Sequence, residues 1–377
     1  MKKIVIAPDS YKGSLSASEV CEIIAVAVEK VLPEVEIVKL PIADGGEGLV
    51  DALLEALGGE KVWVEVDDPL GRSIKAFYGV LPNGKVVIEM AAASGLPLVK
   101  DTENDILKAS TLGTGMLIRH ALLRGYRQFI LGLGGSATSD GGAGAGAALG
   151  IRYMDETGKP ILGGGDLCGL SQIDTTEMMP EFREATFSIA CDVHNPLFGE
   201  NGAAYVYSPQ KGASPEQVVM LDKGLRRLAE QVREQTGIVL QEIPGTGAAG
   251  GLVVPFLVFG KAEIRSGVDV VLDTIGFDEH LAGCDLVITG EGRTDRQSSM
   301  GKVLSGIGRR CLEKGVPVIA LSGALEEGYE ALYEQGITAF FAATRKVCTL
   351  EEAMREAREN LSEAAEDLMR VISVFVE

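Results

Sequence analysis

Residues 284–323, "CDLVITGEGRTDRQSSMGKVLSGIGRRCLEKGVPVIALSG", alternate an apolar strand, a polar loop, a helix and a second apolar strand. A third apolar run, ITAFFAAT at 337–344, follows a helical segment at 326–336. Strands and helices that alternate in this way are typical of a parallel sheet whose crossover connections are helices. The end of the chain therefore predicts three βα units of an α/β protein. A last helix is predicted from about 350 to 372, with Thr349 and Glu352 as its capping box.

The start of the chain predicts two more units of the same kind. Apolar runs at 3–8 and 35–43 are each followed by a helical segment, and Ser16 with Glu19 forms a capping box for the first helix. Two units from the front and three from the back give a five-stranded parallel sheet of flavodoxin-like order. In that order the first strand neighbours the third, and ligands bind beyond their carboxyl ends.

The middle of the chain has a different pattern. Antiparallel strands and turns are indicated over 61–90, a helix near 104–124, a strand at 187–193 and a long amphipathic helix at 215–236. We therefore predict an α/β protein of two domains. A Rossmann/flavodoxin-like parallel-sheet domain is built from both chain ends, 1–62 and 283–377, and a second α/β domain with a glycine-rich phosphate-binding loop, 63–282, is inserted between them.

Composition limits the class of ligand. The chain has 377 residues and a formal net charge of −19, which argues against a nucleic-acid or anionic-membrane surface. Six scattered cysteines without a CxxC pair and only three histidines argue against a disulfide framework and a zinc site. No run is long enough for a membrane helix, so we expect a soluble, cytoplasmic protein. An anionic ligand would need local cations or a metal.

The glycine-rich stretch at 131–150 allows three interpretations. Its GLGGSA segment (132–137) matches a loose GxGxxA dinucleotide fingerprint, with Asp155 about 20 residues later. The hydroxyl and carboxyl groups that follow, at Ser136, Thr138, Ser139 and Asp140, suit a phosphate or Mg²⁺ shell better. From residue 144 onward the glycines are interpreted as close packing of a helix on the sheet.

Two further polar loops follow predicted strands that should be neighbours, at 7–14 and 289–302. The second ends with Lys302 at a helix start, where an ammonium and backbone N–H groups can bind an anion. Carboxylates follow four apolar strands, at Asp9, Asp44, Asp192 and Glu291. A single acid there is usually a cap or turn former. Four in glycine-rich settings favour a site that holds the Mg²⁺ of a nucleotide and deprotonates a hydroxyl.

Seven motifs together closely resemble those of the bacterial glycerate kinase family, class I type, in their order and spacing. They are APDSYKGSLSA, PIADGGEG, LGLGGSATSDGGAG, CDVHNPL, GTGAAGG, IRSGVD and TGEGRTDRQSSMGKV. The resemblance implies a kinase that uses ATP and Mg²⁺ to phosphorylate D-glycerate, with 2-phosphoglycerate the usual product. It also implies two α/β domains with the active site in the cleft between them.

On this interpretation each candidate residue receives a role. Asp192 is the candidate for the base or for the Mg²⁺ ligand. Arg293 with Lys12 would clamp the carboxylate of glycerate, since a guanidinium binds a carboxylate through two hydrogen bonds. The remaining substrate-binding candidates are Asp9, Ser10, Asp44, Glu291 and Asp295. The candidates for phosphate and nucleotide binding are Gly134, Gly135, Ser136, Thr138, Asp140 and Lys302.

Three alternatives stay open from the sequence. They are an NAD(P)-dependent hydroxy-acid dehydrogenase, which rests on the GxGxxA match, a kinase that forms 3-phosphoglycerate, and a non-catalytic nucleotide-binding module. The oligomeric state is open as well.

Overall fold

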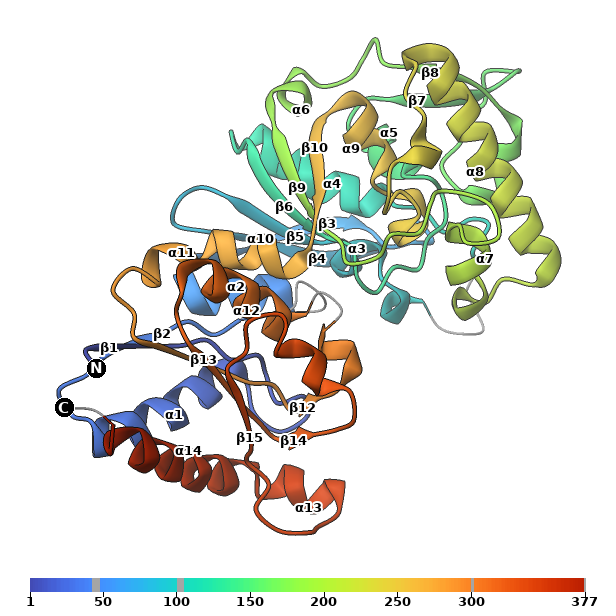
Figure 1. The fold of residues 1–377 in the computed structure, drawn as a ribbon. Helices are drawn as coiled ribbons and strands as arrows, with labels where there is room; N and C mark the ends of the chain where they lie inside the picture. The colour runs from blue at the N-terminus through green and yellow to red at the C-terminus, as the bar shows by residue number, and fades with distance from the viewer. Residues whose placement is uncertain (43–47, 100–104, 300–301, 376–377) are drawn as a thin grey trace. The chain divides into compact units, whose positions relative to one another are not determined.

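The structure is a computed structural model that describes residues 1–42, 48–99, 105–299 and 302–375. Contacts within the chain divide it into two units, each with its own sheet (Figure 1). Unit 1 comprises Met1–Asp44, Glu55–Leu57 and Gly267–Glu377, and unit 2 comprises Gly45–Leu54 and Gly58–Ser266. The α/β class expected from the sequence is confirmed.

Unit 1 takes its elements from both ends of the chain. Its strands are β1 (Lys3–Ile6), β2 (Glu36–Lys39), β11 (Leu286–Thr289), β12 (Arg293–Thr294), β13 (Val318–Ser322), β14 (Ala324–Leu325) and β15 (Ala339–Ala342). Its helices are α1 (Ala17–Val31), α10 (Gly267–Thr274), α11 (Phe277–His280), α12 (Val303–Lys314), α13 (Leu350–Arg355) and α14 (Ala357–Ser373). Helix α2 (Leu49–Leu57) is divided between the two units.

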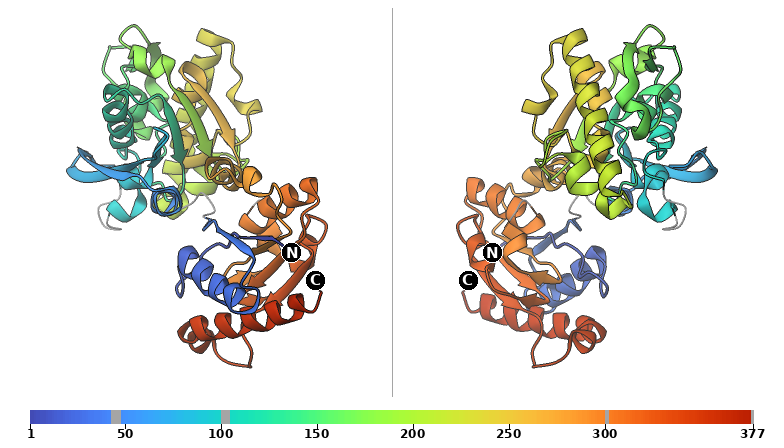
Figure 2. Two further views of the ribbon diagram at one scale, coloured as in Figure 1. Left: turned by 90° about the vertical axis from the view of Figure 1, so that its left-hand side faces the viewer. Right: turned by 90° about the vertical axis from the view of Figure 1, so that its right-hand side faces the viewer.

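The main sheet of unit 1 has the order β15-β13-β11-β1-β2, and every neighbouring pair is parallel. This is the flavodoxin-like order, in which β1 lies beside β11. Ile4, Val5 and Ile6 are all fully buried, as expected for a parallel strand covered on both faces. Helices α1 and α14 pack side by side on one face and α12 lies on the other (Figure 1, Figure 2).

Unit 2 contains the middle of the chain. Its strands are β3 (Glu60–Asp67), β4 (Ser73–Val80), β5 (Val86–Glu89), β6 (Gln128–Gly132), β7 (Arg152–Asp155), β8 (Leu170–Asp174), β9 (Thr186–Ala190) and β10 (Lys261–Arg265). Its helices are α3 (Ala91–Ser94), α4 (Leu112–Leu123), α5 (Ala143–Ala148), α6 (Pro180–Glu184), α7 (Ala203–Tyr207), α8 (Pro215–Thr236) and α9 (Val254–Phe259).

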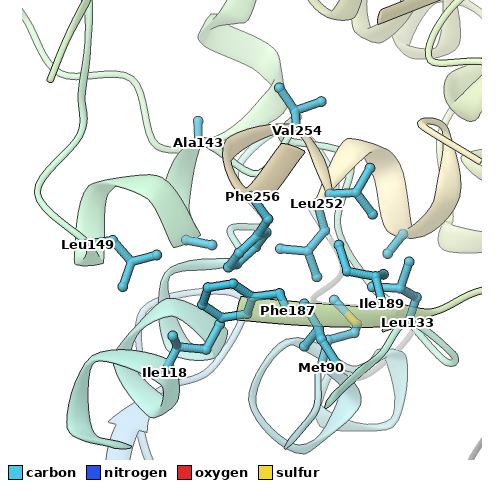
Figure 3. Close-up of a cluster of buried hydrophobic side chains, with 14 of the residues drawn as sticks. Met90, Ile118, Leu133, Ala143, Leu149, Phe187, Ile189, Leu252, Val254 and Phe256 are labelled. Atoms are coloured by element: carbon cyan, nitrogen blue, oxygen red, sulfur yellow. The ribbon is translucent and has the colours of Figure 1, made fainter. Parts of the chain in front are cut away.

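A mixed sheet of order β10-β9-β6-β5-β4-β3 runs through unit 2. Strands β10, β9, β6 and β5 are parallel to one another, and β4 and β3 continue the sheet antiparallel. Phe187 of β9 and Phe256 of α9 meet in its core, with ring centroids 5.0 Å apart (Figure 3). Leu133, which directly follows β6, belongs to the same core. The first residue of the loop after β6 is therefore anchored in the hydrophobic core.

The two predicted capping boxes are confirmed by the structure, whereas two predicted helices differ from it. Ser16 and Glu19 form the capping box of α1, and Thr349 and Glu352 form one at the start of α13. The segment predicted as one helix from 350 to 372 is interrupted at Glu356, so that α13 and α14 are separate. The predicted helix at 326–336 contains only the 3₁₀ turn η7 (Tyr329–Leu332).

The division into units differs from the predicted domain boundaries in two regions. Residues 45–54 and 58–62 fall in unit 2, although they were predicted to lie in the domain built from the chain ends. Helices α10 and α11 fall in unit 1, although they were predicted to lie in the inserted domain. The guanidinium of Arg310 on α12 explains this, because it pairs with Asp269 at 3.1 Å, Asp273 at 2.6 Å and Asp278 at 3.2 Å. The boundaries at residues 62 and 283 as limits of folding domains stay a prediction.

None of the helices among the described residues combines the length and the apolar character needed to span a bilayer. All six cysteines are free thiols.

Candidate functional site

In unit 1 the loops that follow β1 and β11 run side by side. Hydrogen bonds from Ala7 N to Ile288 O and from Asp9 N to Gly290 O, each 2.8 Å, continue the pairing past the strand ends. Tyr11 donates its hydroxyl to Leu321 O at 2.7 Å, which ties the first loop to β13 as well. The structure thus brings the two polar loops together at the carboxyl edge of the sheet, where α/β proteins bind ligands.

Two glycines permit this close approach. A Cβ atom on Gly290 would collide with Leu321 O, and one on Gly292 would lie 3.1 Å from Tyr11 Cα and 3.2 Å from Lys12 N. The backbone of the TGEG segment therefore lies directly against the segment that carries Lys12. Neither contact was foreseen from the sequence, because the first joins residues 31 positions apart and the second joins residues about 280 positions apart.

The candidate residues of unit 1 differ in exposure. Lys12 is exposed, and Asp9 and Ser10 are half-buried, with the Asp9 carboxylate accepting from Ser10 N at 2.6 Å. The Arg293 side chain is 62% exposed and forms ion pairs with Asp295 at 3.5 Å and with Glu326 at 3.7 Å. Its guanidinium is therefore accessible while it is held in place by two acids.

Glu291 is different from these, because it is almost completely buried. Burial raises the pKa of its carboxyl, and hydrogen bonds from the hydroxyls of Ser298 and Thr294 partly oppose this. Its Oε1 atom has no hydrogen-bond partner among the residues that the structure describes. Lys302 also lowers the pKa of Glu291 and stands at the N-cap of α12. Asp44 lies outside the described residues.

In unit 2 the glycine-rich loop follows β6. Gly134 and Gly135 are exposed, and Gly135 has a φ of +73°, a conformation that favours glycine. The loop is tied to the end of α3, because Leu96 N donates to Gly135 O at 2.8 Å and Ala137 N donates to Ser94 O at 3.0 Å. The two glycines at the loop tip are therefore exposed, while backbone hydrogen bonds connect the loop to the segment around the end of α3.

The side chains after Ser136 turn inward. Thr138, Ser139 and Asp140 are fully buried, whereas Ser136 is half-buried. Asp140 accepts from Thr111 N at 2.8 Å and Thr111 Oγ1 at 2.7 Å. It also accepts from the backbone N–H groups of two glycines, Gly142 at 3.1 Å and Gly144 at 3.2 Å. Burial raises the pKa of Asp140, and these bonds oppose the rise.

These four hydrogen bonds join the start of α4 to the start of α5. Asp140 thus holds the loop from inside and does not present its carboxylate on the surface, as a direct phosphate or Mg²⁺ contact would need. The interpretation that the glycines from residue 144 onward pack closely is supported by Gly144, which is buried and where a Cβ would collide with the Ser110 hydroxyl. Phosphate binding by the first part of the stretch stays a prediction.

Asp192 follows β9 at the same edge of the sheet as the glycine-rich loop. Strands β6 and β9 are parallel neighbours with Gly132 opposite Ala190, so the segments that leave them start side by side. The Asp192 side chain is exposed. Unit 2 therefore brings an accessible carboxylate and the open loop tip to one edge.

Sequence reasoning missed Lys211, at the end of the 3₁₀ turn η3 (Pro209–Lys211). Its side chain is only 3% exposed, and its Nζ donates to Ser136 Oγ at 2.6 Å and to Thr138 O at 2.7 Å. The lysine is 75 residues from Ser136 in the chain. The sequence signal was weak, a lone lysine in SPQKGAS before the capping box of α8.

The dinucleotide interpretation is not supported by the structure. Strand β7, which carries Asp155, pairs antiparallel with β8 in a separate two-stranded sheet. The Asp155 carboxylate accepts from Thr157 N at 2.8 Å and Lys159 N at 3.0 Å, so it stabilises a turn. A dinucleotide fingerprint needs this acid at the end of a parallel strand beside β6.

Comparisons with known proteins agree with this arrangement. The model of the glycerate kinase family matches residues 4–373. This chain belongs to the glycerate kinase family. It is 44% identical over 375 residues to "Glycerate kinase" of Halalkalibacterium halodurans, which covers 99% of both chains, and 42% identical over 374 residues to "Glycerate 2-kinase" of Escherichia coli K12, which covers 99% of this chain and 98% of the relative.

A crystal structure has the same fold. It belongs to a Salmonella typhimurium LT2 protein assigned as glycerate kinase 2, and it is 42% identical, with a TM-score of 0.89 over 99% of this chain and 98% of the other. Family membership makes the protein a phosphotransferase with ATP as one of its small-molecule substrates.

Proposed function

We propose that this kinase transfers the γ-phosphoryl group of ATP to the 2-hydroxyl of D-glycerate and forms 2-phosphoglycerate and ADP. The observation that carries the proposal is the match of residues 4–373 to the glycerate kinase family, together with relatives that align over 98–99% of their length and are named "Glycerate kinase" and "Glycerate 2-kinase". The separate sheet of β7 and β8 removes the main support for a dehydrogenase.

The loops of unit 1 are proposed to bind glycerate. Arg293 offers an accessible guanidinium whose position is fixed by Asp295 and Glu326, and Lys12 lies on the adjoining loop. A guanidinium binds a carboxylate through two parallel hydrogen bonds, which fixes orientation as well as charge. Asp9, Ser10 and Asp295 complete the proposed polar surroundings of the two hydroxyls.

The loop after β6 is proposed to bind the phosphates of ATP. Gly134 and Gly135 expose backbone to which oxygen atoms can approach closely, and Ser136 adds a hydroxyl. Lys302 at the start of α12 is a further candidate for phosphate. Thr138 and Asp140 lie beneath the loop and are proposed to hold its shape.

Asp192 is proposed to accept the proton of the 2-hydroxyl while the oxygen attacks the γ-phosphorus and the bond to the β,γ-bridging oxygen breaks. Its exposure and its position beside the loop support this role. Phosphoryl transfer depends mainly on positioning and on neutralising charge, so one carboxylate and several cations suffice for the protein's share of the chemistry.

Mg²⁺ is expected to accompany ATP and to neutralise charge on its phosphates. The described residues contain no group of three or more acidic, histidine or cysteine side chains that could form an all-protein metal site. One accessible carboxylate next to a phosphate loop does suit Mg²⁺, which proteins bind through one or two carboxylates together with substrate phosphates. Asp192 is the residue we propose to hold Mg²⁺ if it does not act as the base.

Two broader expectations belong to the same proposal. The net charge of −19 supports small-molecule substrates and no nucleic-acid partner. Six free thiols support a cytoplasmic location, because reduced cysteines are typical of that compartment.

Product analysis tests the proposal. The purified chain is incubated with D-glycerate, ATP and Mg²⁺, and the product is examined by proton-coupled ³¹P NMR. A phosphate on O2 couples to one proton and gives a doublet, whereas a phosphate on O3 couples to two protons and gives a triplet. A triplet would show a kinase that forms 3-phosphoglycerate. If ADP forms but no phosphorylated glycerate is detected, glycerate is rejected as the acceptor.

A further inference from the structure

The buried ammonium group of Lys211 is hydrogen-bonded to the glycine-rich loop from the interior of unit 2. Lys211 is almost completely buried, and its Nζ donates to Ser136 Oγ at 2.6 Å and to Thr138 O at 2.7 Å. Burying a charged amine is costly unless it is well hydrogen-bonded, and an apolar residue in its place would often be at least as stable. This placement therefore calls for an explanation other than stability.

The bond to Ser136 has a direct consequence for that hydroxyl. An ammonium can only donate, so Ser136 Oγ is the acceptor and its own hydrogen points to another partner. Ser136 is the last side chain of the loop that reaches the surface, since Thr138 and Asp140 are fully buried. Lys211 thus orients Ser136 as a donor, which is the polarity that a phosphate oxygen requires.

The same loop is held from a second side. A Cβ atom on Gly250 would collide with Thr138 O, and Gly250 O accepts from Gly141 N at 2.9 Å. The neighbouring Ala249 has a φ of +49°, which is uncommon for a residue other than glycine. A residue kept in this conformation indicates that the surrounding contacts are strongly determined. The loop is therefore rigid around Thr138 O, the second acceptor of Lys211.

The charge of Lys211 is sensitive to pH near neutrality. Burial lowers the pKa of its amine to about 7, and the Asp140 carboxylate acts in the opposite direction. Helix α7 packs against η3, and the hydroxyl of its Tyr207 donates to Asn195 Oδ1 at 2.6 Å. An anion bound at the loop would favour the protonated amine, so the charge can respond to occupancy of the loop.

We propose that Lys211 is a positioning residue for phosphoryl transfer, which fixes Ser136 as a donor and holds a positive charge beneath the loop that receives the triphosphate of ATP. The inference rests on the proposed function of that loop. It assigns a task to a residue that does not itself reach the surface, and it predicts that ATP, not glycerate, is the substrate whose binding depends on it.

The experiment compares Lys211→Met, Lys211→Arg and Ser136→Ala with the unaltered enzyme. Lys223→Met serves as the matched control, because Lys223 is an exposed lysine of α8 in the same unit. ATP binding without glycerate is measured by titration calorimetry, and KM for each substrate is measured separately. Circular dichroism and thermal melting show which variants are folded.

Lys211→Met is expected to weaken ATP binding by about tenfold or more, the usual effect of losing one hydrogen bond to a charged group, with less change in KM for glycerate. In the unaltered enzyme kcat/KM for ATP should fall above pH 7 as the amine loses its proton, since this parameter reports groups of the free enzyme. Lys211→Arg should lack that fall between pH 6 and 9. Because ATP titrates in both reactions alike, the comparison isolates the lysine.

Unchanged ATP binding in folded Lys211→Met, or the same fall with pH in Lys211→Arg, would overturn the inference. If Lys211→Met does not fold, the pH profile of Lys211→Arg and the ATP affinity of Ser136→Ala decide. Failure of the proposed function has a different signature. In that case glycerate is not phosphorylated by any variant, while calorimetry still shows whether ATP binding depends on Lys211.

Discussion

The stability of unit 2 is expected to depend on pH through Lys211. The pKa of its amine is about 7 in the folded chain against 10.5 for an ordinary lysine. Between these values the unfolded chain binds one more proton than the folded chain, so the free energy of unfolding rises with pH. Below pH 7 the folded state carries the whole cost of burying the charged amine, which corresponds to about 5 kcal/mol.

The prediction concerns the difference in the free energy of unfolding between the unaltered chain and Lys211→Met, in which the titrating groups that do not interact with Lys211 cancel. Lys211→Met should be the more stable of the two at pH 6, and its advantage should shrink by roughly 2–3 kcal/mol between pH 6 and pH 9. This change with pH follows from the pKa of Lys211. The packing of the methionine shifts the stability difference by the same amount at pH 6 and at pH 9.

Urea unfolding followed by tryptophan fluorescence measures this difference. Trp63 is the single tryptophan of the chain, lies on β3 in unit 2 and packs against Phe77 with ring centroids 4.9 Å apart. Its signal therefore reports the unit that contains Lys211. Lys223→Met should show no comparable change with pH. A difference between the unaltered chain and Lys211→Met that stays constant from pH 6 to pH 9 would refute the reasoning.

Three other predictions concern the loops. Asp140→Ala should lower the free energy of unfolding by about 3–5 kcal/mol, because it leaves buried donors without their acceptor; urea unfolding monitors this, and a loss below about 1 kcal/mol would contradict the bracing role. Gly250→Ala should lower the free energy of unfolding by more than the roughly 1 kcal/mol expected for a positive φ alone, since its Cβ would collide with Thr138 O. Gly237→Ala is the control for the effect of φ, because Gly237 has a φ of +78° and no atom within 4 Å of the added Cβ. Arg293→Lys should lower kcat/KM for glycerate about ten- to a hundredfold with little effect on ATP; an equal loss for both substrates in steady-state kinetics would reject the clamp.

Features that depend on neighbouring residues were predicted well from the sequence. The capping boxes at Ser16 and Thr349 and the start of α8 at Pro215 each rest on a few consecutive side chains. The parallel order of the unit 1 sheet also followed from local patterns, since alternating strands and helices leave few topologies. Its register and its glycine contacts did not, because they are set by atoms far apart in the chain.

Features that depend on distant partners were missed or misplaced. Arg310 binds α10 and α11 to unit 1 through three acids, and nothing in the spacing of those residues indicates it. Asp140 was expected in a phosphate or Mg²⁺ shell because it stands among hydroxyl groups and glycines, yet it is buried and accepts from Thr111, 29 residues away. A carboxylate in a glycine-rich segment has the same sequence signature whether it contacts a bound phosphate or stabilises the loop from inside.

Lys211 shows why the charge of the whole chain is a poor guide to such a site. A net charge of −19 disfavours a nucleoside triphosphate at long range, but solution ions screen that repulsion within about 8–10 Å. Affinity must then come from donors in contact with the phosphates or just behind them, where the surroundings are less polar and each charge acts more strongly. On the proposed assignment, the loop after β6 would meet this need with small residues outside, which would let the backbone approach the ligand, and one cation inside, which donates to the Ser136 hydroxyl oxygen. A lysine on the surface would supply the same charge, but it would neither orient Ser136 nor hold the loop in place before ATP arrives.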